Sequence, residues 1–457
     1  MKRKISKISS KKEVVMPVVN PHAAGIDVGS RSHFVAIGQG TDDVREFGVY
    51  TDSLHSLCQY LQGEGITSVA LESTGGYWQR LFLMLQSYGL NPILVSGKFT
   101  QNVQGKKTDV QDCQWIQRMH MLGLLPNSYQ PNYFTEQVRQ YARHRQGLLE
   151  NGASYILKMQ QALRHMNIRL DVAIADVVGQ SGQAIIKAIL AGQQDAKYLA
   201  SLANFRIRKS KEELERALTG IFRPEYIFEL KQCFEMYEFL HQKIAECDAQ
   251  IAALIDQHLE ERECEDGVQR KQYDKKPPKR NKNDPRMPIQ QFAFQLSDGV
   301  DLSEIDGVSA STLMTLISEI GLDVSQFPSA KHFASWLRLS PNNKVSGGKV
   351  ISSHTKKRKN RLGQALQRVA NVIGSNYKEG ALHQFFMRIK FKKGHQQAIV
   401  ATARKVAVII WNMLSNKEAF NYETDQSYAD KIKQQTIKNM QRKIKKMGIR
   451  AEDLISN

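Results

Sequence analysis

The chain has 457 residues, too many for one hydrophobic core of ordinary size, so we expect two or three domains. Its formal net charge of +19 indicates a polyanionic partner, with nucleic acid as the first candidate, because lysine and arginine neutralise phosphates and release counterions. No apolar run approaches the ~20 residues of a membrane span, and the basic first residues lack the apolar core of a signal peptide. We therefore expect a soluble, cytoplasmic protein.

The cysteines occur without a CxxC motif and without Cys/His pairing, which argues against a zinc site and against a disulfide framework. We expect all of them to be reduced thiols without a metal role. They are Cys58, Cys113, Cys233, Cys247 and Cys264.

After a basic tail at residues 1–20, the pattern predicts an α/β domain over residues 21–130. Short apolar runs bounded by turn residues predict strands, at 23–30, 33–40, 44–50, 68–73 and 91–97. Apolar spacing of three and four residues predicts helices over 53–62 and 77–89. Three strands followed by strands and helices in alternation indicate a mixed sheet.

The rest of the chain is predicted to be mainly helical. Residues 131–265 carry long charged stretches with helical apolar spacing, which predict a long coiled-coil-like region that packs on a partner. Residues 266–290 are rich in Lys, Arg, Pro and Asn and predict a basic linker or loop. A second compact domain is expected at 291–415, and a basic helical tail at 416–457.

Four carboxylates of the first domain stand at positions that suggest a metal site. Asp27 lies inside an apolar strand, Glu72 ends another, and Asp109 and Asp112 share one helix face, where like charges repel unless a cation lies between them. Two divalent cations on such a cluster could activate an attacking oxygen in phosphoryl transfer, and magnesium or manganese suits an all-oxygen site. Each acid also has an explanation without a metal. Asp27 could end a strand, and Glu72 could cap the helix that begins near Tyr77. Asp109 and Asp112 could be acids that the helix dipole favours in a first turn.

The segments GIDVGS, LESTGGYW and KTDVQDCQ, in this order, resemble the DEDD transposases of bacterial insertion sequences, the family that includes the Piv-type invertases. ESTGGYW, NPILVSG and GKKTD are also similar to that family, and the resemblance resumes in the segment from EIDGVSAS to NKVSGGK. It implies an α/β plus α architecture with an RNase H-like (RuvC-like) first domain. It also implies that Asp27, Glu72, Asp109 and Asp112 are catalytic and bind Mg²⁺, two ions per site, with Mn²⁺ as a substitute.

In the C-terminal domain, IDGVSASTLMTLISEIG predicts a helix-hairpin-helix-like element around Gly307, whose backbone N–H groups could hold a phosphate, or a plain helical hairpin. Ser346 stands before two glycines and among lysines; by itself such a segment is usually a turn. The resemblance implies that Ser346 is the nucleophile, with Ser352 and Ser353 as fallback candidates. Arg358, where we would expect glycine, and Gly363, where arginine is common, depart from the family pattern.

The resemblance further implies a transposase or site-specific recombinase guided by a structured bridge RNA that pairs with donor and target DNA. It implies a homo-oligomer, a dimer and then a tetramer in synapsis, acting in the bacterial cytoplasm at the nucleoid. The residues expected to bind nucleic acid are Lys106, Lys107, Gly307, Lys344, Gly347, Gly348, Lys349, Lys356, Lys357 and Arg358.

Three other functions remain open on sequence alone. A RuvC-like nuclease would hydrolyse DNA with water and leave Ser346 as a turn residue. GIDVG also resembles the first phosphate strand of an actin-like sugar kinase or ATPase, although no second glycine-rich phosphate loop with an aspartate is evident. A noncatalytic nucleic-acid-binding scaffold is favoured if the four acids do not converge.

Overall fold

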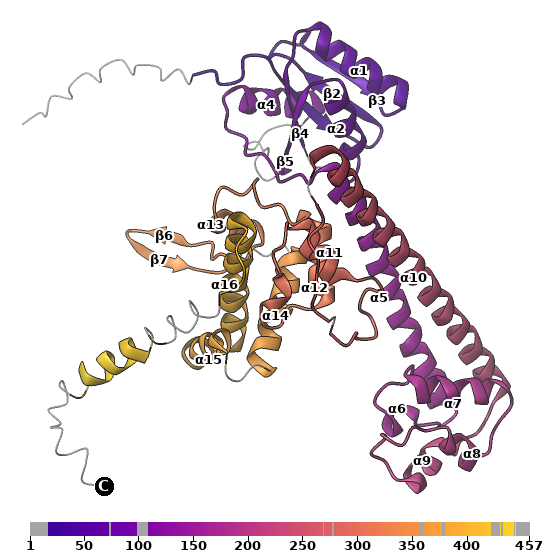
Figure 1. Ribbon diagram of the computed structural model, residues 1–457. Coiled ribbons are helices and arrows are strands. Elements are labelled where there is room, and N and C mark those ends of the chain that lie inside the picture. Colours follow the sequence, from indigo (N-terminus) through magenta and orange to yellow (C-terminus); the bar gives the residue numbers. More distant parts are fainter. Residues whose placement is uncertain are drawn as a thin grey trace, which may run out of the picture. The chain divides into compact units, whose positions relative to one another are not determined.

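The computed structural model describes residues 17–72, 75–97, 108–267, 269–276, 278–355, 360–376, 380–421, 430, 433–442 and 444. The chain divides into two compact units, Met1–Gln130 and Pro131–Asn457 (Figure 1). Each unit has a hydrophobic core of its own.

The first unit is built on a five-stranded mixed sheet, and all the strands predicted for it are present. They are β1 (Ala23–Val28), β2 (Ser32–Ala36), β3 (Val44–Gly48), β4 (Ser68–Glu72) and β5 (Asn91–Val95). The spatial order is β3-β2-β1-β4-β5, so β1 is central. It pairs antiparallel with β2 and parallel with β4, and β5 extends the parallel side.

Helices cover both faces of this sheet, which is why the central strand is apolar along most of its length. Helices α1 (Thr51–Gly63) and α2 (Trp78–Ser87) contribute Leu57 and Leu81 to the core on one face. Helix α4 (Asp109–Met121) covers the other face, where its Ile116 packs against Ala70 and Val95. The predicted α/β architecture is confirmed for this unit.

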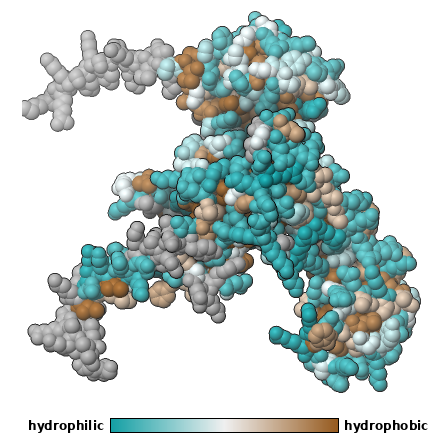
Figure 2. Space-filling view, in the orientation of Figure 1, coloured by the Kyte–Doolittle hydropathy of each residue, from teal (hydrophilic) through white to brown (hydrophobic). Residues whose placement is uncertain are grey.

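The second unit begins with two long antiparallel helices, α5 (Tyr133–His165) and α10 (Pro224–Asp266). At one end of the pair, the rings of Phe134 and His258 stack with centroids 3.8 Å apart; at the other end, His165 stacks on Tyr226 at 4.9 Å. Proline in the first turn and Gly267 in the left-handed region set the limits of α10. Hydrophilic residues cover most of the visible face of this pair (Figure 2).

Four short helices fill the chain between α5 and α10. They are α6 (Leu170–Ala173), α7 (Gln180–Leu190), α8 (Ala196–Ser201) and α9 (Lys211–Leu218). Their apolar faces and the ends of α5 and α10 share one buried cluster that includes Met159, Ile186, Leu214 and Leu230. These distal helices therefore form a small lobe with its own core at one end of the long pair (Figure 1).

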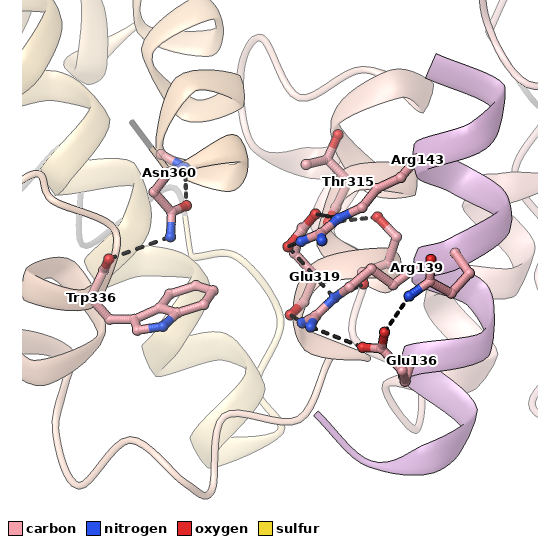
Figure 3. A network of polar contacts seen from close by, with 10 residues as sticks. Glu136, Arg139, Arg143, Thr315, Glu319, Trp336 and Asn360 are labelled. Atoms are coloured by element: carbon pink, nitrogen blue, oxygen red, sulfur yellow. Dashed lines mark hydrogen bonds and ion pairs between the residues drawn. The ribbon is translucent and has the colours of Figure 1, made fainter. Parts of the chain in front are cut away.

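The remaining helices form a C-terminal bundle. They are α11 (Ile289–Leu296), the 3-10 helix η1 (Leu302–Glu304), α12 (Ala310–Ile320), α13 (Ala330–Trp336), α14 (Arg361–Asn376), α15 (Ala381–Lys393) and α16 (His395–Asn416). The strands β6 (Lys344–Ser346) and β7 (Lys349–Ser352) form a hairpin between α13 and α14. This bundle is attached to α5, because Arg139 and Arg143 of α5 bind Glu319 of α12 (Figure 3).

One expectation about membrane spans needs correction. Helix α16 is 22 residues long, and a window within it has a mean hydropathy of 1.4, which is long and apolar enough to cross a membrane. The sequence expectation missed it because Arg404 and Lys405 interrupt the apolar run. In the bundle, α16 packs against α13, α14 and α15 through residues such as Ala403 and Ile410.

The basic segment between α10 and α11 has no helix or strand among its described residues, and ion pairs attach it to the helices. Arg270 binds Asp256 at 3.2 Å, and Lys275 binds Asp301 at 2.9 Å. The segment that composition predicted as a linker or loop is thus held to the helices by ion pairs, and Met287 near its end is buried.

The buried ion pair between Arg145 of α5 and Asp248 of α10 provides a stability test. Arg145 Nε donates to Asp248 Oδ1 at 2.6 Å, and both side chains are nearly inaccessible. We expect Asp248→Ala to lower the free energy of unfolding by about 3–5 kcal/mol, because the guanidinium stays buried without its carboxylate. Urea denaturation would measure the change.

The control is Glu246→Ala, which removes an exposed pair with Lys243 and should change the free energy of unfolding by less than about 1 kcal/mol. Equal effects of the two substitutions would contradict a structural role for the buried pair.

Candidate active site

Two of the predicted carboxylates lie at the same edge of the sheet. The parallel strands β1 and β4 pair Ile26 with Leu71, so Asp27 and Glu72 are the next positions in register. Ile26 and Leu71 face the core under α1 and α2. Since side chains alternate along a strand, Asp27 and Glu72 face the side that α4 covers.

Helix α4 brings the other two carboxylates to this edge. A Cβ atom at Gly25 would lie 2.5 Å from the carbonyl oxygen of Cys113, so the helix backbone rests directly on β1. Further along α4, the Gln117 amide donates to the carbonyl oxygen of Ala23 at 3.2 Å. The helix therefore runs opposite to β1, and its first turn, with Asp109 and Asp112, lies toward the strand end that carries Asp27.

Glutamines that sequence reasoning missed hold α4 in this position. Gln39, just after β2, donates to the Gln117 side chain at 2.7 Å and to the Gln114 carbonyl at 3.0 Å. Gln114 donates back to the carbonyls of Gln39 and Gly40. The spacing of Gln114 and Gln117 by three residues, on the same helix as the two aspartates, was the signal available in the sequence.

Electrostatics support the same convergence. The pKa of Cys113 is raised to about 12, mainly because the thiol is buried, and the negative charges of Asp27 and Asp112 contribute to the same rise. Both carboxylates are therefore close enough to the buried thiol to influence it. Cys113 is therefore a neutral thiol at physiological pH.

The donor set fits a hard divalent cation, because all four groups supply carboxylate oxygens. Asp109 is exposed, and Asp27, Glu72 and Asp112 are partly buried. Within the part of the chain that the structure describes, no three His, Cys, Asp or Glu side chains form a metal-binding group. The backbone thus brings the four positions to one edge of the sheet, while the side chains do not form a closed coordination shell.

Glu72 is not the N-cap residue of the helix that follows it. Helix α2 begins at Trp78, and its N-cap residue, Tyr77, has no side-chain hydrogen bond at this terminus. The Glu72 side chain instead extends past the end of β5, where a Cβ at Gly97 would lie 2.5 Å from Glu72 Oε1. Glycine at 97 therefore leaves room for the carboxylate.

Ser346 lies at the tip of the β6–β7 hairpin in the second unit. Gly347 and Gly348 form its two-residue turn with φ of 54° and 74°, a left-handed geometry that glycine adopts without strain. Ser346 pairs with Lys349 across the turn, and both are exposed. Among the described residues, none hydrogen-bonds to the Ser346 hydroxyl. The serine is thus held at an accessible point beside lysine.

Gly307 lies in the turn between η1 and α12, with φ of 78°. A Cβ at this position would lie 3.1 Å from the carbonyl oxygen of Val369, so packing against α14 also requires glycine here. The N-terminus of α12, at Val308 to Ala310, borders a hollow of about 190 Å³ whose other wall includes Lys279 and Arg280. The helix N-terminus and the two cations favour a phosphate, whereas Asp284, which lines the same hollow, opposes one.

The departure at Gly363 has a packing explanation. Gly363 lies in the first turn of α14, directly against the carbonyl oxygen of Leu337 at the end of α13, where any Cβ would collide. Asn360 caps this turn by accepting a hydrogen bond from the Gly363 N–H at 2.9 Å, while its amide donates to the Trp336 carbonyl (Figure 3).

Several predicted nucleic-acid contacts lie outside the described residues. They are Lys106, Lys107, Lys356, Lys357 and Arg358.

Comparison with known protein families gives two matches. The DEDD transposases of the IS110 type match residues 24–168, which run from β1 through α5 and include all four carboxylates. The transposase IS116/IS110/IS902 family matches residues 301–385, which include Gly307 and Ser346. The two matched segments thus contain the residues that the sequence pattern singled out in each unit.

The chain is also similar to the pilin gene-inverting proteins of Moraxella bovis and Moraxella lacunata. Each is 34% identical over 125 residues, which is 26% of this chain and 38% of the relative. The match thus spans less than half of either inverting protein.

The contact at Gly25 yields a testable expectation. Gly25→Ala should lower the free energy of unfolding by about 1–3 kcal/mol, because its methyl group would force the α4 backbone away from β1. Chemical denaturation followed by circular dichroism would measure it. The control Gly63→Ala, in open space at the end of α1, should be neutral or slightly stabilising. A neutral Gly25→Ala would show that α4 is not packed as described.

Proposed function

We propose that this chain, which belongs to the IS116/IS110/IS902 family of transposases, cuts and rejoins DNA strands through a covalent phosphoserine link at Ser346. The observation that carries the proposal is the arrangement of Asp27, Glu72 and the first turn of α4 at one edge of the sheet. An RNase H-like (RuvC-like) interpretation of the first unit is supported by its mixed sheet, in which antiparallel strands precede parallel ones.

In the proposed reaction, the Ser346 hydroxyl oxygen attacks the phosphorus of a DNA phosphodiester and gives up its proton. The bond from that phosphorus to one sugar oxygen breaks, the sugar oxygen takes up a proton, and a serine–DNA phosphodiester forms. A sugar hydroxyl of another strand then displaces the serine. One phosphodiester replaces another at each step, so joining needs no nucleotide hydrolysis.

The chain's own residues would prepare both partners of this reaction. The hairpin presents Ser346 at an accessible position, and Lys344 and Lys349 beside it supply positive charge for the phosphate. Asp27, Glu72, Asp109 and Asp112 would hold Mg²⁺, or Mn²⁺ in its place, which supplies activation of the attacking oxygen and stabilisation of the leaving one. The acids and the serine belong to separate units, and we propose that they act across subunits of a homo-oligomer.

We also propose that a bridge RNA selects donor and target DNA by base pairing. The net charge of +19 supports a polyanionic partner of this kind. In this role the protein binds the RNA through backbone shape and charge, while base pairing carries the choice of sequence. The place of action would be the bacterial cytoplasm, at the nucleoid.

A water-using, RuvC-like nuclease is the alternative. The observation that favours it is that no described residue hydrogen-bonds to the Ser346 hydroxyl, so none is placed to take its proton. Such an enzyme would need the four acids but not the serine. The two functions differ in one product, a covalent protein–DNA adduct.

We expect purified protein with its flanking RNA, Mg²⁺ and labelled donor and target DNA to form an adduct that survives a denaturing gel. Ser346→Ala should reduce adduct formation at least about a hundredfold, because the nucleophile is removed. Ser353→Ala, which changes a serine just beyond the same hairpin, serves as the control and should form the adduct normally. Cleaved strands without an adduct, at equal rates in the wild type and Ser346→Ala, would establish the nuclease instead.

Removal of the metal should stop the same reaction. With EDTA, or in Asp109→Asn, adduct formation should fall at least about a hundredfold, because carboxylate-bound cations no longer activate the serine. Added Mg²⁺ should restore the EDTA-treated wild type but not the variant. Asp52→Asn, an acidic residue in the first turn of α1, is the matched control. Full activity in EDTA would contradict the metal assignment.

A further inference from the structure

The two most exposed large apolar side chains of the described chain are both phenylalanines in basic runs. Phe391 is 93% exposed in the segment RIKFKK, and Phe205 is 87% exposed at the start of FRIRKSK. Neither run contains an acidic residue. A phenyl ring left in water forgoes the free energy of burial, so both rings are available to a partner outside the fold.

Phe391 differs from the other phenylalanines on its helix. Phe386 is buried against His395, and the ring of Phe385 lies 5.4 Å from the charged groups of Arg388 and Lys405. Among the described residues, Phe391 makes no ring–ring or cation–ring contact. The lysines around it suit the negative end of the α15 dipole, but the helix dipole gives no reason for a phenyl ring.

The charge of the surrounding chain points to a polyanion. From residue 324 to residue 417, the sequence contains one acidic residue, Glu379, among many lysines and arginines. The described residues 390–397, at the joint between α15 and α16, are all exposed. An aromatic ring surrounded by lysines on such a surface complements a nucleic acid strand, which offers both phosphate and base faces.

Phe205 repeats this arrangement on the distal helices. It lies in the loop between α8 and α9, where the Arg206 guanidinium lies 5.5 Å from its ring, and Arg208 and Lys209 follow. The C-terminal bundle contacts α5 at Arg143, and the distal lobe begins beyond His165, roughly 33 Å further along the helix. The two phenylalanines therefore belong to separate lobes of the second unit.

We propose that Phe391 and Phe205 are stacking platforms for unpaired nucleotides, with each ring covering one face of a base while the adjacent lysines and arginines bind the phosphates. Stacking of this kind tolerates any sequence, and it requires a base that is not already stacked within a duplex. The inference rests on the proposed function, in which RNA loops and opened DNA strands supply unpaired nucleotides.

The test uses the full-length chain and fluorescent oligonucleotides, one single-stranded DNA, one single-stranded RNA and one duplex of equal length. Wild type and variants are compared at the same salt concentration, and each binding measurement is then repeated over a salt series. Phe391→Ala and Phe205→Ala should each weaken single-strand binding about tenfold and leave duplex binding unchanged. The slope of log affinity against log salt should stay the same, because no charge is removed. Phe391→Trp should retain affinity, and its fluorescence should be quenched by the bound strand.

The matched control is Phe228→Ala, which removes an exposed phenylalanine of α10 that neighbours Glu225 and Glu229. It should bind both kinds of strand like the wild type. Unchanged single-strand affinity in both test variants would overturn the proposal, as would an equal loss for duplex and single strand. A shift in oligomeric state, or loss of binding to anionic vesicles alone, would likewise overturn it.

The adduct assay separates failure of this inference from failure of the proposed function. If wild-type protein forms the Ser346 adduct, and Phe391→Ala and Phe205→Ala both bind single strands normally, the recombinase proposal holds and the stacking proposal fails. If wild-type protein forms no adduct and binds no strand, both the proposed function and the stacking proposal fail.

Discussion

The direct contact between α4 and the central strand is the constraint on which the candidate metal site depends. A helix normally lies about 10 Å from a sheet because side chains separate them, but Gly25 has no side chain and α4 rests on the backbone. The orientation of α4 then decides where its first turn lies. Glutamine hydrogen bonds from the chain after β2 fix that orientation, so Asp109 and Asp112 lie toward the strand end of Asp27.

The second unit holds its candidate nucleophile, Ser346, at an exposed position rather than a buried one. Ser346 stands on a two-residue turn whose glycines fix the backbone, and its neighbours are lysines rather than core residues. A serine on a mobile loop would lose entropy on meeting a phosphate, whereas a hairpin of this type loses less because its turn geometry is already set. A buried ion pair of this unit, Arg145 with Asp248, lies in the long helical pair instead.

The strands and the mixed sheet of the first unit could be predicted from sequence, because short apolar runs alternate there with turn residues. The four acids stood out at strand positions and at a helix start. The resemblance added roles for these residues but no geometry. The glutamine contacts of α4 could not be predicted, since they join residues more than seventy positions apart. In the sequence, Gly363 appeared only as a departure from the family pattern. The carbonyl group of Leu337, which leaves no room for a side chain at position 363, comes from another helix. The lobe of α6 to α9 follows no pattern that we could name.

The long antiparallel pair has a mechanical consequence. The chain enters α5 and leaves α10 at the same end, and the distal lobe is supported only through these two helices and the Lys282–Asp176 ion pair among the described contacts. The number of turns in the two helices therefore sets the distance between the distal lobe and the bundle. Seven residues added to each helix at matching positions would move the tip by roughly 10 Å. The span between the two lobes is therefore a length that evolution or design can change without touching either core.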